Sequence, residues 1–454
     1  MFILADFIDS LKNLDSLFDL EEQVIRCLRE MFQEIVSKYL IQLDETLVSQ
    51  IPSDHTFINR QPRTINFMFG AVSFERRCYR KTDGTNYFPL DTHLKLVSRK
   101  RFSPYFKSVV SKIGQMTTMR NTADMINLAS QTDISAWAVD KIVREMADIV
   151  AVEEETLDKE IVHRKKVDNL VIEGDAFEVR ERGKQRVSVH HYRVYESTNA
   201  GPINKREFIE TNHLKVRKQV CDYLEAHYKL SEMVVFLASD AGPGYDPISM
   251  RELVPEAKKV EYVIDRYHFI RKFEQTIGLQ NPLSRKATAA IREYNLNQLA
   301  AILDTFESQI TTGKDSEKLT KLRHYLSRNW KYIKRPKDRG YKYMGKLGSV
   351  ESSHRAFTYR LKKQGKSWSK EGLQAMLVLI LARVNRHLNQ DLSSGLRRLR
   401  KLKIEVSLEA IKSIRFTDLN RKIRSQHIGV KIGNITVDSS TSSPIGTMAK
   451  AYSR

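Results

Sequence analysis

The chain has 454 residues, of which 41% are hydrophobic and 29% are charged, proportions typical of a globular protein with a sizeable core. Its 76 Lys and Arg residues outnumber 55 Asp and Glu residues, so the formal net charge is +21. This excess predicts a polyanionic partner, because neutralising phosphates releases condensed counterions. An anionic membrane surface and a structural RNA are the alternatives.

The sequence also bears on the cell compartment. Its longest apolar stretch, near residues 373–382, is too short to span a bilayer, so we expect no membrane partner. The N-terminus reaches Asp6 without the basic region of a secretory signal. Three widely spaced cysteines, Cys27, Cys78 and Cys221, predict neither a disulfide framework nor a Cys-based zinc site. These features predict a cytoplasmic, nucleoid-associated protein.

The N-terminal segment, residues 1–60, is predicted to be mainly helical. Over residues 21–49, large apolar residues recur at steps of three and four, which places them on one helix face. This face would pack in a core or against a partner helix. The residues concerned are Ile25, Leu28, Phe32, Ile35 and Tyr39.

Residues 61–97 are predicted to hold a β-hairpin, with strands at 64–69 and 72–80 on either side of Gly70. Arg76 and Arg77 lie among aromatic residues on the second strand. Such a strand is able to follow a phosphate backbone, but charges that protect an exposed sheet edge give the same pattern.

Residues 98–160 predict a DNA-binding helix-turn-helix. A helix starts at Ser103, and a second segment near 121–129 leads through a four-residue turn into a helix from Ile134 to about Val152. Lys141 and Arg144, together with Trp137, would face DNA from the last helix. Helix pairs of this kind also occur without any nucleic acid.

A mixed α/β block follows, as the first part of a core over residues 165–272. The pattern predicts three strands, a helix, a strand, a second helix and a last strand, which is also the order of an RNase H-like fold. The predicted elements are 167–179, 185–196, 205–214, 216–229, 233–240, 248–258 and 260–265.

The rest of the chain is predicted to be helical. Residues 273–345 form a basic helical insertion, and residues 346–400 return to the core with an apolar helix over 373–387. Residues 401–454 form a basic and partly disordered tail. The predicted fold class is therefore multidomain α+β, with a mixed core interrupted by helices.

Three carboxylates are candidates for one site. Asp175 lies on the first strand of the α/β block, Asp240 ends its fourth strand, and Glu351 lies in the first turn of a later helix. If those strands are neighbours, the two aspartates meet at one sheet edge, and converging carboxylates suit Mg²⁺. Alternatives remain, since Asp240 could be a turn residue, Glu351 could favour its helix dipole, and Glu173 rivals Asp175.

The chain resembles DDE-type transposases of bacterial insertion sequences, in the ISLre-type branch. Five segments, in this order and spacing, carry the resemblance, which covers about residues 20–400. They are Tyr87–Asp91, Ile172–Ala176, Ser239–Gly242, Asp265–His268 and Gly348–Arg355. The Gly-Asp-Ala at the first acid departs from the Asp-Gly of many relatives.

The resemblance implies an RNase H-like core with a helical insertion between the second and third acids. It implies that Asp175, Asp240 and Glu351 are catalytic and hold two Mg²⁺ ions, with Mn²⁺ as a substitute. The implied partner is double-stranded DNA, both the terminal inverted repeats and the target, bound by a homodimer or larger assembly. A non-catalytic DNA-binding protein, such as a regulator or a decayed transposase, is the alternative.

Other residues are expected to assist this site. Asp265 and His268 resemble an acid-x-x-His pair of related transposases, although a His so close to an Asp more often makes a structural hydrogen bond than binds a metal. His354 and Arg355 share the helix face of Glu351 and could reach a phosphate. Trp330 and Trp368 could stack on an unpaired base, although such residues are more often buried in a core. All six are auxiliary or DNA-binding candidates.

Overall fold

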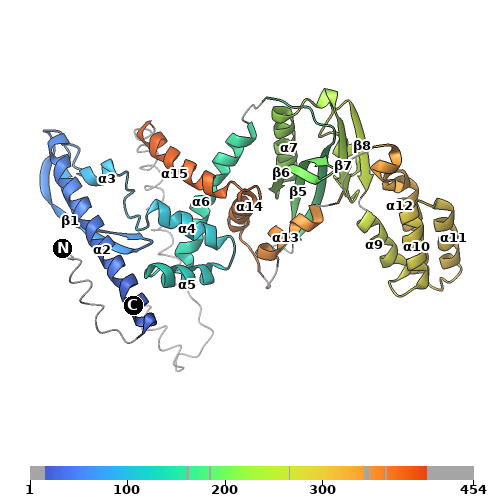
Figure 1. The fold of residues 1–454 in the computed structure, drawn as a ribbon, viewed down its shortest axis with the longest axis horizontal. Coiled ribbons are helices and arrows are strands. Elements are labelled where there is room, and N and C mark those ends of the chain that lie inside the picture. Colours follow the sequence, from blue (N-terminus) through green and yellow to red (C-terminus); the bar gives the residue numbers. More distant parts are fainter. Residues whose placement is uncertain are drawn as a thin grey trace, which may run out of the picture. The chain divides into compact units, whose positions relative to one another are not determined.

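The computed structural model describes residues 16–159, 163–183, 186–264, 266–341, 347–348, 350–362 and 366–405 (Figure 1). The chain divides into two compact units, Met1–Gly395 and Leu396–Arg454, and every contact discussed below lies within the first. It is a mixed α+β protein with a three-stranded and a five-stranded sheet. None of the helices among the described residues combines the length and apolarity needed to cross a bilayer.

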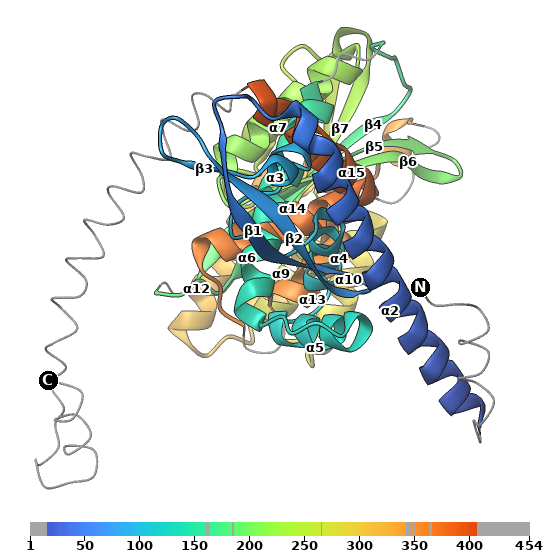
Figure 2. The ribbon, with the colours of Figure 1, turned by 90° about the vertical axis from the view of Figure 1, so that its left-hand side faces the viewer.

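The N-terminal part joins one long helix to the small sheet. The predicted hairpin is present as an antiparallel pair, and the helix packs on it through buried apolar residues such as Leu40 and Phe74 (Figure 2). The elements are α2 (Leu17–Thr46), η1 (Leu47–Gln50), β1 (Thr56–Phe67), β2 (Gly70–Arg80), β3 (Asn86–Tyr87) and α3 (Pro89–His93).

Three helices follow: α4 (Pro104–Gly114), α5 (Met119–Ser130) and α6 (Ala136–Lys159). Ser103 and Thr118 cap the first two, because each hydroxyl accepts a backbone N–H of the first turn. Asn127 closes the turn between α5 and α6 by hydrogen bonds to both the N–H and the carbonyl of Ile134. The helix α6 runs further than the predicted end at Val152.

The five-stranded sheet has the order β6-β5-β4-β7-β8. The pairs β6–β5 and β5–β4 are antiparallel, whereas β4–β7 and β7–β8 are parallel. The predicted sequence of three strands, helix, strand, helix and strand is confirmed. Its elements are β4 (Leu170–Val179), β5 (Val187–Thr198), β6 (Gly201–Glu210), α7 (His213–His227), η2 (Leu230–Glu232), β7 (Val234–Ser239), α8 (Pro247–Arg251) and β8 (Lys259–Ile264).

Two predicted elements of this block have wrong boundaries. The helix expected over 248–258 ends at Arg251, because Pro255 disfavours helical backbone in the residue before it and cannot donate a helical hydrogen bond. The strand expected over 205–214 begins at Gly201, where antiparallel pairing with β5 continues beyond the apolar run, and ends at Glu210 before Asn212 caps α7.

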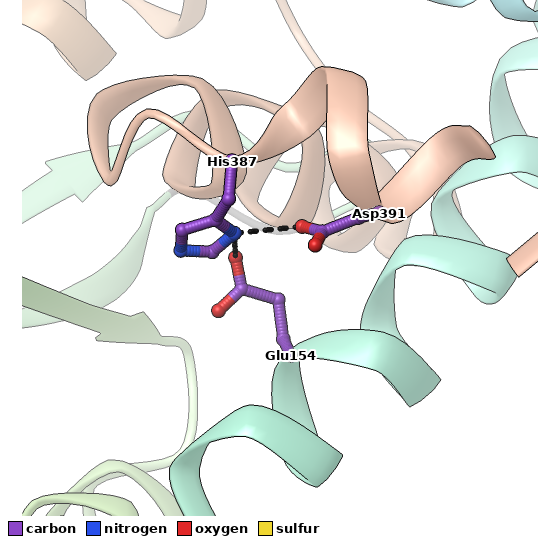
Figure 3. Close-up of side chains that lie close together, drawn as sticks. All are labelled: Glu154, His387 and Asp391. Atoms are coloured by element: carbon purple, nitrogen blue, oxygen red, sulfur yellow. Dashed lines mark hydrogen bonds and ion pairs between the residues drawn. The ribbon is translucent and has the colours of Figure 1, made fainter. Parts of the chain in front are cut away.

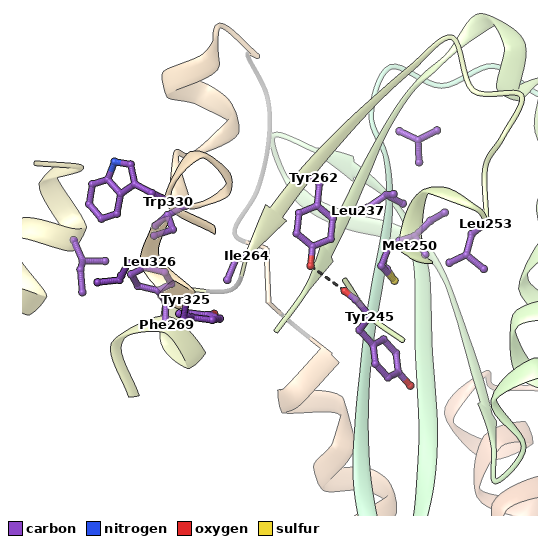
Figure 4. Packing of buried hydrophobic residues seen from close by; sticks show 14 of the residues in the cluster. Leu237, Tyr245, Met250, Leu253, Tyr262, Ile264, Phe269, Tyr325, Leu326 and Trp330 are labelled. Atoms are coloured by element: carbon purple, nitrogen blue, oxygen red, sulfur yellow. Dashed lines mark hydrogen bonds between the residues drawn. The ribbon is translucent and has the colours of Figure 1, made fainter. Parts of the chain in front are cut away.

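Helices cover both faces of this sheet. On one face, α7 and α8 share a hydrophobic core with the strands. The insertion helices continue this core beyond the edge strand β8 (Figure 1), where Figure 4 shows Ile264 of β8 close to insertion residues such as Tyr325. On the other face, α13 contacts β4 and β5, and α14 contacts β6 and α6. The elements are α9 (Arg266–Ile277), α10 (Pro282–Glu293), α11 (Leu296–Glu307), α12 (Gly313–Ile333), η3 (Pro336–Arg339), α13 (Val350–Leu361), α14 (Lys370–Val384) and α15 (Leu388–Glu405). The predicted tail beyond Glu405 lies outside the described residues.

Candidate active site

The two predicted aspartates belong to neighbouring parallel strands: Asp175 lies within β4, and Asp240 directly follows β7. Glu173 of β4 is paired with Ala238 of β7, and two residues further along each chain come Asp175 and Asp240. Residues in register on parallel strands project from the same face, so continuing this register by two residues would place the two half-buried side chains on the same face of the sheet. The pKa of Tyr245 is raised by burial, by Tyr192 and then by the carboxylates of Asp175 and Asp240. The phenol of Tyr245 is therefore within electrostatic reach of both aspartates. The expectation that these strands are neighbours is confirmed.

The loop that carries Asp240 is held by its own hydrogen bonds. The hydroxyl of Tyr262 donates to the carbonyl oxygen of Tyr245 at 3.0 Å (Figure 4). The hydroxyl of Ser239 donates to the same oxygen at 2.6 Å. Ala241 adopts a left-handed backbone conformation with φ of 59°, which is uncommon for a residue with a side chain. Asp240 Oδ1 accepts the N–H of Gly242 at 2.8 Å. The turn therefore fixes the carboxylate instead of leaving it on a loose loop.

Glu173, the rival of Asp175, anchors the helix that follows the insertion. It is fully buried, and its carboxylate accepts the N–H groups of Gly348 (2.8 Å) and Val350 (2.7 Å) and the hydroxyl of Tyr195 (2.8 Å). Both oxygens thus serve donors at the N-terminus of α13, where a negative charge is favourable. The contact fixes the start of α13, whose second residue is Glu351, next to β4. The side chain of Glu351 lies outside the described residues.

One turn further along α13, His354 lies beside the first aspartate. Its Nδ1 is 3.7 Å from Asp175 Oδ2, and its ring is 5.0 Å from that of His191, measured between centroids. His191 in turn meets Glu207 at 2.8 Å. By contrast, Arg355 is exposed. Of the two neighbouring candidates on α13, His354 is the one in contact with an acid.

The cluster behind His354 is charged and buried. Arg193 donates to Glu207 at 2.6 Å, beside the bond from His191. Burial pushes the pKa of Glu207 upward, but the bonds and charges of His191 and Arg193 outweigh it and hold the pKa below its usual value. An ionised Glu207 therefore orients the imidazole of His191, whose ring lies beside that of His354 in a tilted arrangement.

Sequence reasoning missed Lys272 of α9. Its ammonium lies over the ring of Tyr325, 3.7 Å from the centroid. Burial lowers the pKa of Lys272, whereas the carboxylate of Asp240 acts in the opposite direction and Arg328 adds to the lowering. A lysine from the insertion is thus within the electrostatic reach of Asp240. No local motif marks it, because the contact depends on how the insertion packs on the sheet.

The predicted DNA-contacting residues of the helical region differ in exposure. Trp137 is 73% exposed at the start of α6, with the ammonium of Lys141 at 5.2 Å from its ring centroid. Arg144 instead donates to Asp140 at 2.8 Å and to Ser369, the cap of α14, at 3.1 Å. Arg144 therefore ties two helices together, while Lys141 faces solvent.

The hairpin arginines make ion pairs inside the protein. Arg76 is buried, donates to Asp91 at 2.8 Å and lies over the ring of Phe88. Arg77 pairs with Asp44 of α2 at 2.8 Å. Both attach neighbouring helices to the sheet, so neither offers a free charge to a phosphate in this structure.

Trp330 and Trp368, predicted to contact DNA, are instead buried in the core, which was the alternative that the sequence left open. Trp330 is buried and stacks on Tyr294, with ring centroids 4.9 Å apart. Trp368 is buried, and its indole N–H donates to the carbonyl of Leu361 at 3.0 Å. Neither indole is presented to a base at the surface. Asp265 and the side chain of His268 lie outside the described residues.

A second cluster joins Glu154 of α6 to His387 and Asp391 near the start of α15 (Figure 3). Their ligand atoms lie within 4.8 Å of one another, a spacing that a metal ion could bridge. His387 Nδ1 is 2.7 Å from Asp391 and 3.2 Å from Glu154, and Arg206 meets both His387 and Glu154. Since the guanidinium of Arg206 can only donate, the Nε2 of His387 that it meets must accept. The imidazole proton therefore lies on Nδ1, which faces the two carboxylates. The arginine already supplies the positive charge, so we interpret this cluster as an ion-pair network.

Fold and site together define an α+β protein with a carboxylate-bearing edge on its larger sheet. The chain belongs to the family described as "Uncharacterised protein family (UPF0236)", which matches residues 10–398. One relative, "UPF0236 protein in vanSb 3'region" of Streptococcus gallolyticus, is 29% identical over 461 residues, covering 99% of this chain and 100% of the relative. Among solved structures, the chain is similar to the "Drosophila P element transposase strand transfer complex" with a TM-score of 0.26 and 11% identity, over 68% of this chain and 84% of the other. A TM-score this low does not define a shared fold.

Proposed function

We propose that this protein is a DDE-type transposase of the ISLre-type branch that cuts and joins DNA at the ends of an insertion sequence. Asp175, Asp240 and Glu351 are the proposed catalytic residues. One observation carries the proposal: Glu173 anchors the start of α13 on β4, the strand that holds Asp175, and the parallel neighbour β7 leads into Asp240. Three acids from distant segments thereby share one region of the fold.

The sheet itself supports an RNase H-like core. Its order β6-β5-β4-β7-β8, with an antiparallel meander on one side and parallel strands on the other, agrees with the predicted order of elements. In this proposal α9 to α12 form the helical insertion between the second and third acids. Their shared hydrophobic core with the sheet would hold the two acids in a fixed relation.

The donor set fits a hard divalent cation. Asp175 and Asp240 offer carboxylate oxygens that are half-buried rather than sealed, which suits two Mg²⁺ ions or the substitute Mn²⁺. When bound, such ions would stabilise the attacking and leaving oxygens of a phosphodiester. Glu351 completes the proposed ligand set, and Glu173 does not belong to it because its oxygens accept backbone N–H groups.

Residues around the acids would position the substrate. Lys272 provides a positive charge near Asp240, where a scissile phosphate would be held. His354 contacts Asp175 and would fix its orientation, while Arg355 is exposed toward solvent. Asp265 and His268 remain auxiliary candidates on the strength of the resemblance.

The proposed DNA-binding element is the helix-turn-helix of α5 and α6. Exposed Trp137 and Lys141 lie at the start of α6, where a recognition helix meets base edges and backbone. The net charge of +21 favours binding to terminal inverted repeats and to target DNA. The active assembly would be a homodimer or larger, because both ends of the element must be held together.

Cleavage of end DNA tests the proposal. The full chain is incubated with labelled duplexes that tile the DNA flanking its coding sequence, with Mg²⁺ or Mn²⁺. We expect cutting at the element boundary, and loss of cutting but not of binding in Asp175→Asn, Asp240→Asn and Glu351→Gln. The matched control is Glu178→Gln, an exposed carboxylate on the same strand β4.

Other outcomes identify the competing functions. Binding of end DNA by the native chain without cutting under either ion supports a non-catalytic DNA-binding protein. Preference for RNA over DNA supports a structural RNA-binding protein. Full cleavage by any one acid variant removes that residue from the site.

A further inference from the structure

The long helix α2 carries an apolar stripe that faces solvent. Five large side chains at steps of three and four along the helix make up this α2 stripe, and each is between 40% and 59% exposed. Phe18, seven residues before Ile25, is 75% exposed. The stripe consists of Ile25, Leu28, Phe32, Ile35 and Tyr39. A contiguous exposed apolar surface of this kind usually marks an interaction site.

A different face of α2 already binds the rest of its domain. Leu40 and Leu47 are buried against the hairpin, and Ser37 donates to the carbonyl of Ser73 at 2.8 Å. Asp44 pairs with Arg77 on the same face. Of the stripe, Phe32 touches the hairpin at its margin, with its ring centroid 6.0 Å from that of Phe69. Apart from Phe32, the helix is therefore docked without using the stripe.

The spacing of the stripe indicates the kind of partner. Steps of three, four, three and four residues are the a and d positions of a heptad repeat, which keeps a narrow seam on one side of a helix. In the sequence the same spacing continues upstream of Phe18 at Leu4, Phe7, Leu11 and Leu14. A seam with this repeat fits another helix with the same repeat, not a sheet, whose side chains recur every second residue.

We propose that the α2 stripe is a homotypic interface, which pairs with the α2 stripe of a second copy of this chain. A second copy presents the same repeat, and a two-fold pairing uses the same patch on both partners. Five large side chains about half exposed would cover roughly 500 Å² on each protomer, and the pair then buries about 1,000 Å², the lower limit for a specific interface. The proposal does not depend on the catalytic function.

The mass of the full-length protein in solution tests the interface. Sedimentation equilibrium should give a dimer for the native chain at micromolar concentration. Leu28→Glu combined with Ile35→Glu places charges in the seam and should raise the dimer dissociation constant about 100-fold or more. The control Arg26→Glu puts a carboxylate on another exposed face of α2 and should leave the dimer intact.

Two further measurements keep the test decisive. Far-ultraviolet circular dichroism checks that the double variant keeps its helices, which is expected because Glu is a better helix former than Ile. Hydrogen exchange of the native chain should slow in α2 as the protein concentration rises, without any substitution. A native chain that is monomeric at these concentrations, or a double variant that dimerises like the native chain, overturns the proposal.

Discussion

The strongest test of the site concerns Glu173, because its substitution should loosen α13 without touching the proposed catalytic acids. Glu173→Gln keeps the size of the side chain but replaces one acceptor oxygen with an N–H₂ group. The carboxylate serves the N–H groups of Gly348 and Val350 and the hydroxyl of Tyr195, so at least one of these donors loses its acceptor. The amide also brings its own donors against them.

The expected cost follows from the burial of this contact. A buried donor left without an acceptor costs about 1–3 kcal/mol, and removing a negative charge from a helix N-terminus adds up to about 1 kcal/mol. We therefore expect Glu173→Gln to lower the free energy of unfolding by about 1–4 kcal/mol. Glu178→Gln makes the same chemical change at an exposed position of β4 and should cost less than about 0.5 kcal/mol.

Two measurements check this prediction. Urea denaturation compares the midpoints of the native chain and both variants. Hydrogen exchange then locates the effect, since the amides of α13 should exchange faster in Glu173→Gln than in Glu178→Gln. Equal midpoints and equal exchange in the two variants would refute the role of Glu173 as the anchor of α13. The physical link between Glu351 and the sheet edge would be lost with it.

Three other predictions follow from the structure. Burial and then His213 lower the pKa of His190 from 6.5 to about 4. Between these pH values His190 stays neutral in the folded protein but takes up a proton in the unfolded chain. The free energy of unfolding should therefore fall by about 2 kcal/mol, after allowance for partial exposure, as the pH drops from 6.5 to 4. In His190→Gln the urea midpoint should change less with pH, and an identical profile contradicts the prediction. Asp91→Ala leaves the buried side chains of Arg63 and Arg76 without the carboxylate that both bind. It should lower the free energy of unfolding, measured by urea denaturation, by about 3 kcal/mol. A loss below about 1 kcal/mol would show that these ion pairs are dispensable. Lys141→Ala should weaken end-DNA binding and reduce its salt-dependence slope by about 1 with the fold unchanged, as measured by fluorescence anisotropy; an unchanged slope removes α6 from the DNA interface.

The roles of the charged and aromatic candidates could not be read from the sequence. Arg76 and Lys141 both lie in basic, aromatic-rich segments, yet Arg76 is bound to Asp91 and Lys141 faces solvent. Arg144 finds one of its partners, Ser369, in a helix more than two hundred residues away. Composition indicates that the chain is basic, but ion pairing between distant segments decides which charges remain available to a partner.

The sequence by itself determined the order of elements and the positions of the acids. Local rules act over a few residues, so hydroxyl caps such as Ser103, apolar runs and turn residues mark helices and strands reliably. Those rules also placed Asp240 at the end of a buried strand. They erred at Pro255, where one residue outweighed a favourable helical pattern.

Only the tertiary structure decided how the acids are used. Glu173 and Asp175 are two residues apart on the same strand face, and the local pattern does not distinguish them. Packing distinguishes them, because α13 returns across the sheet and places its N-terminal N–H groups on Glu173. Sheet order likewise puts β4, the strand of Asp175, beside β7, which Asp240 follows, and the packing of the insertion brings Lys272 within electrostatic reach of Asp240. Such contacts join segments far apart in the chain, so their energies depend on the whole fold and not on any local pattern.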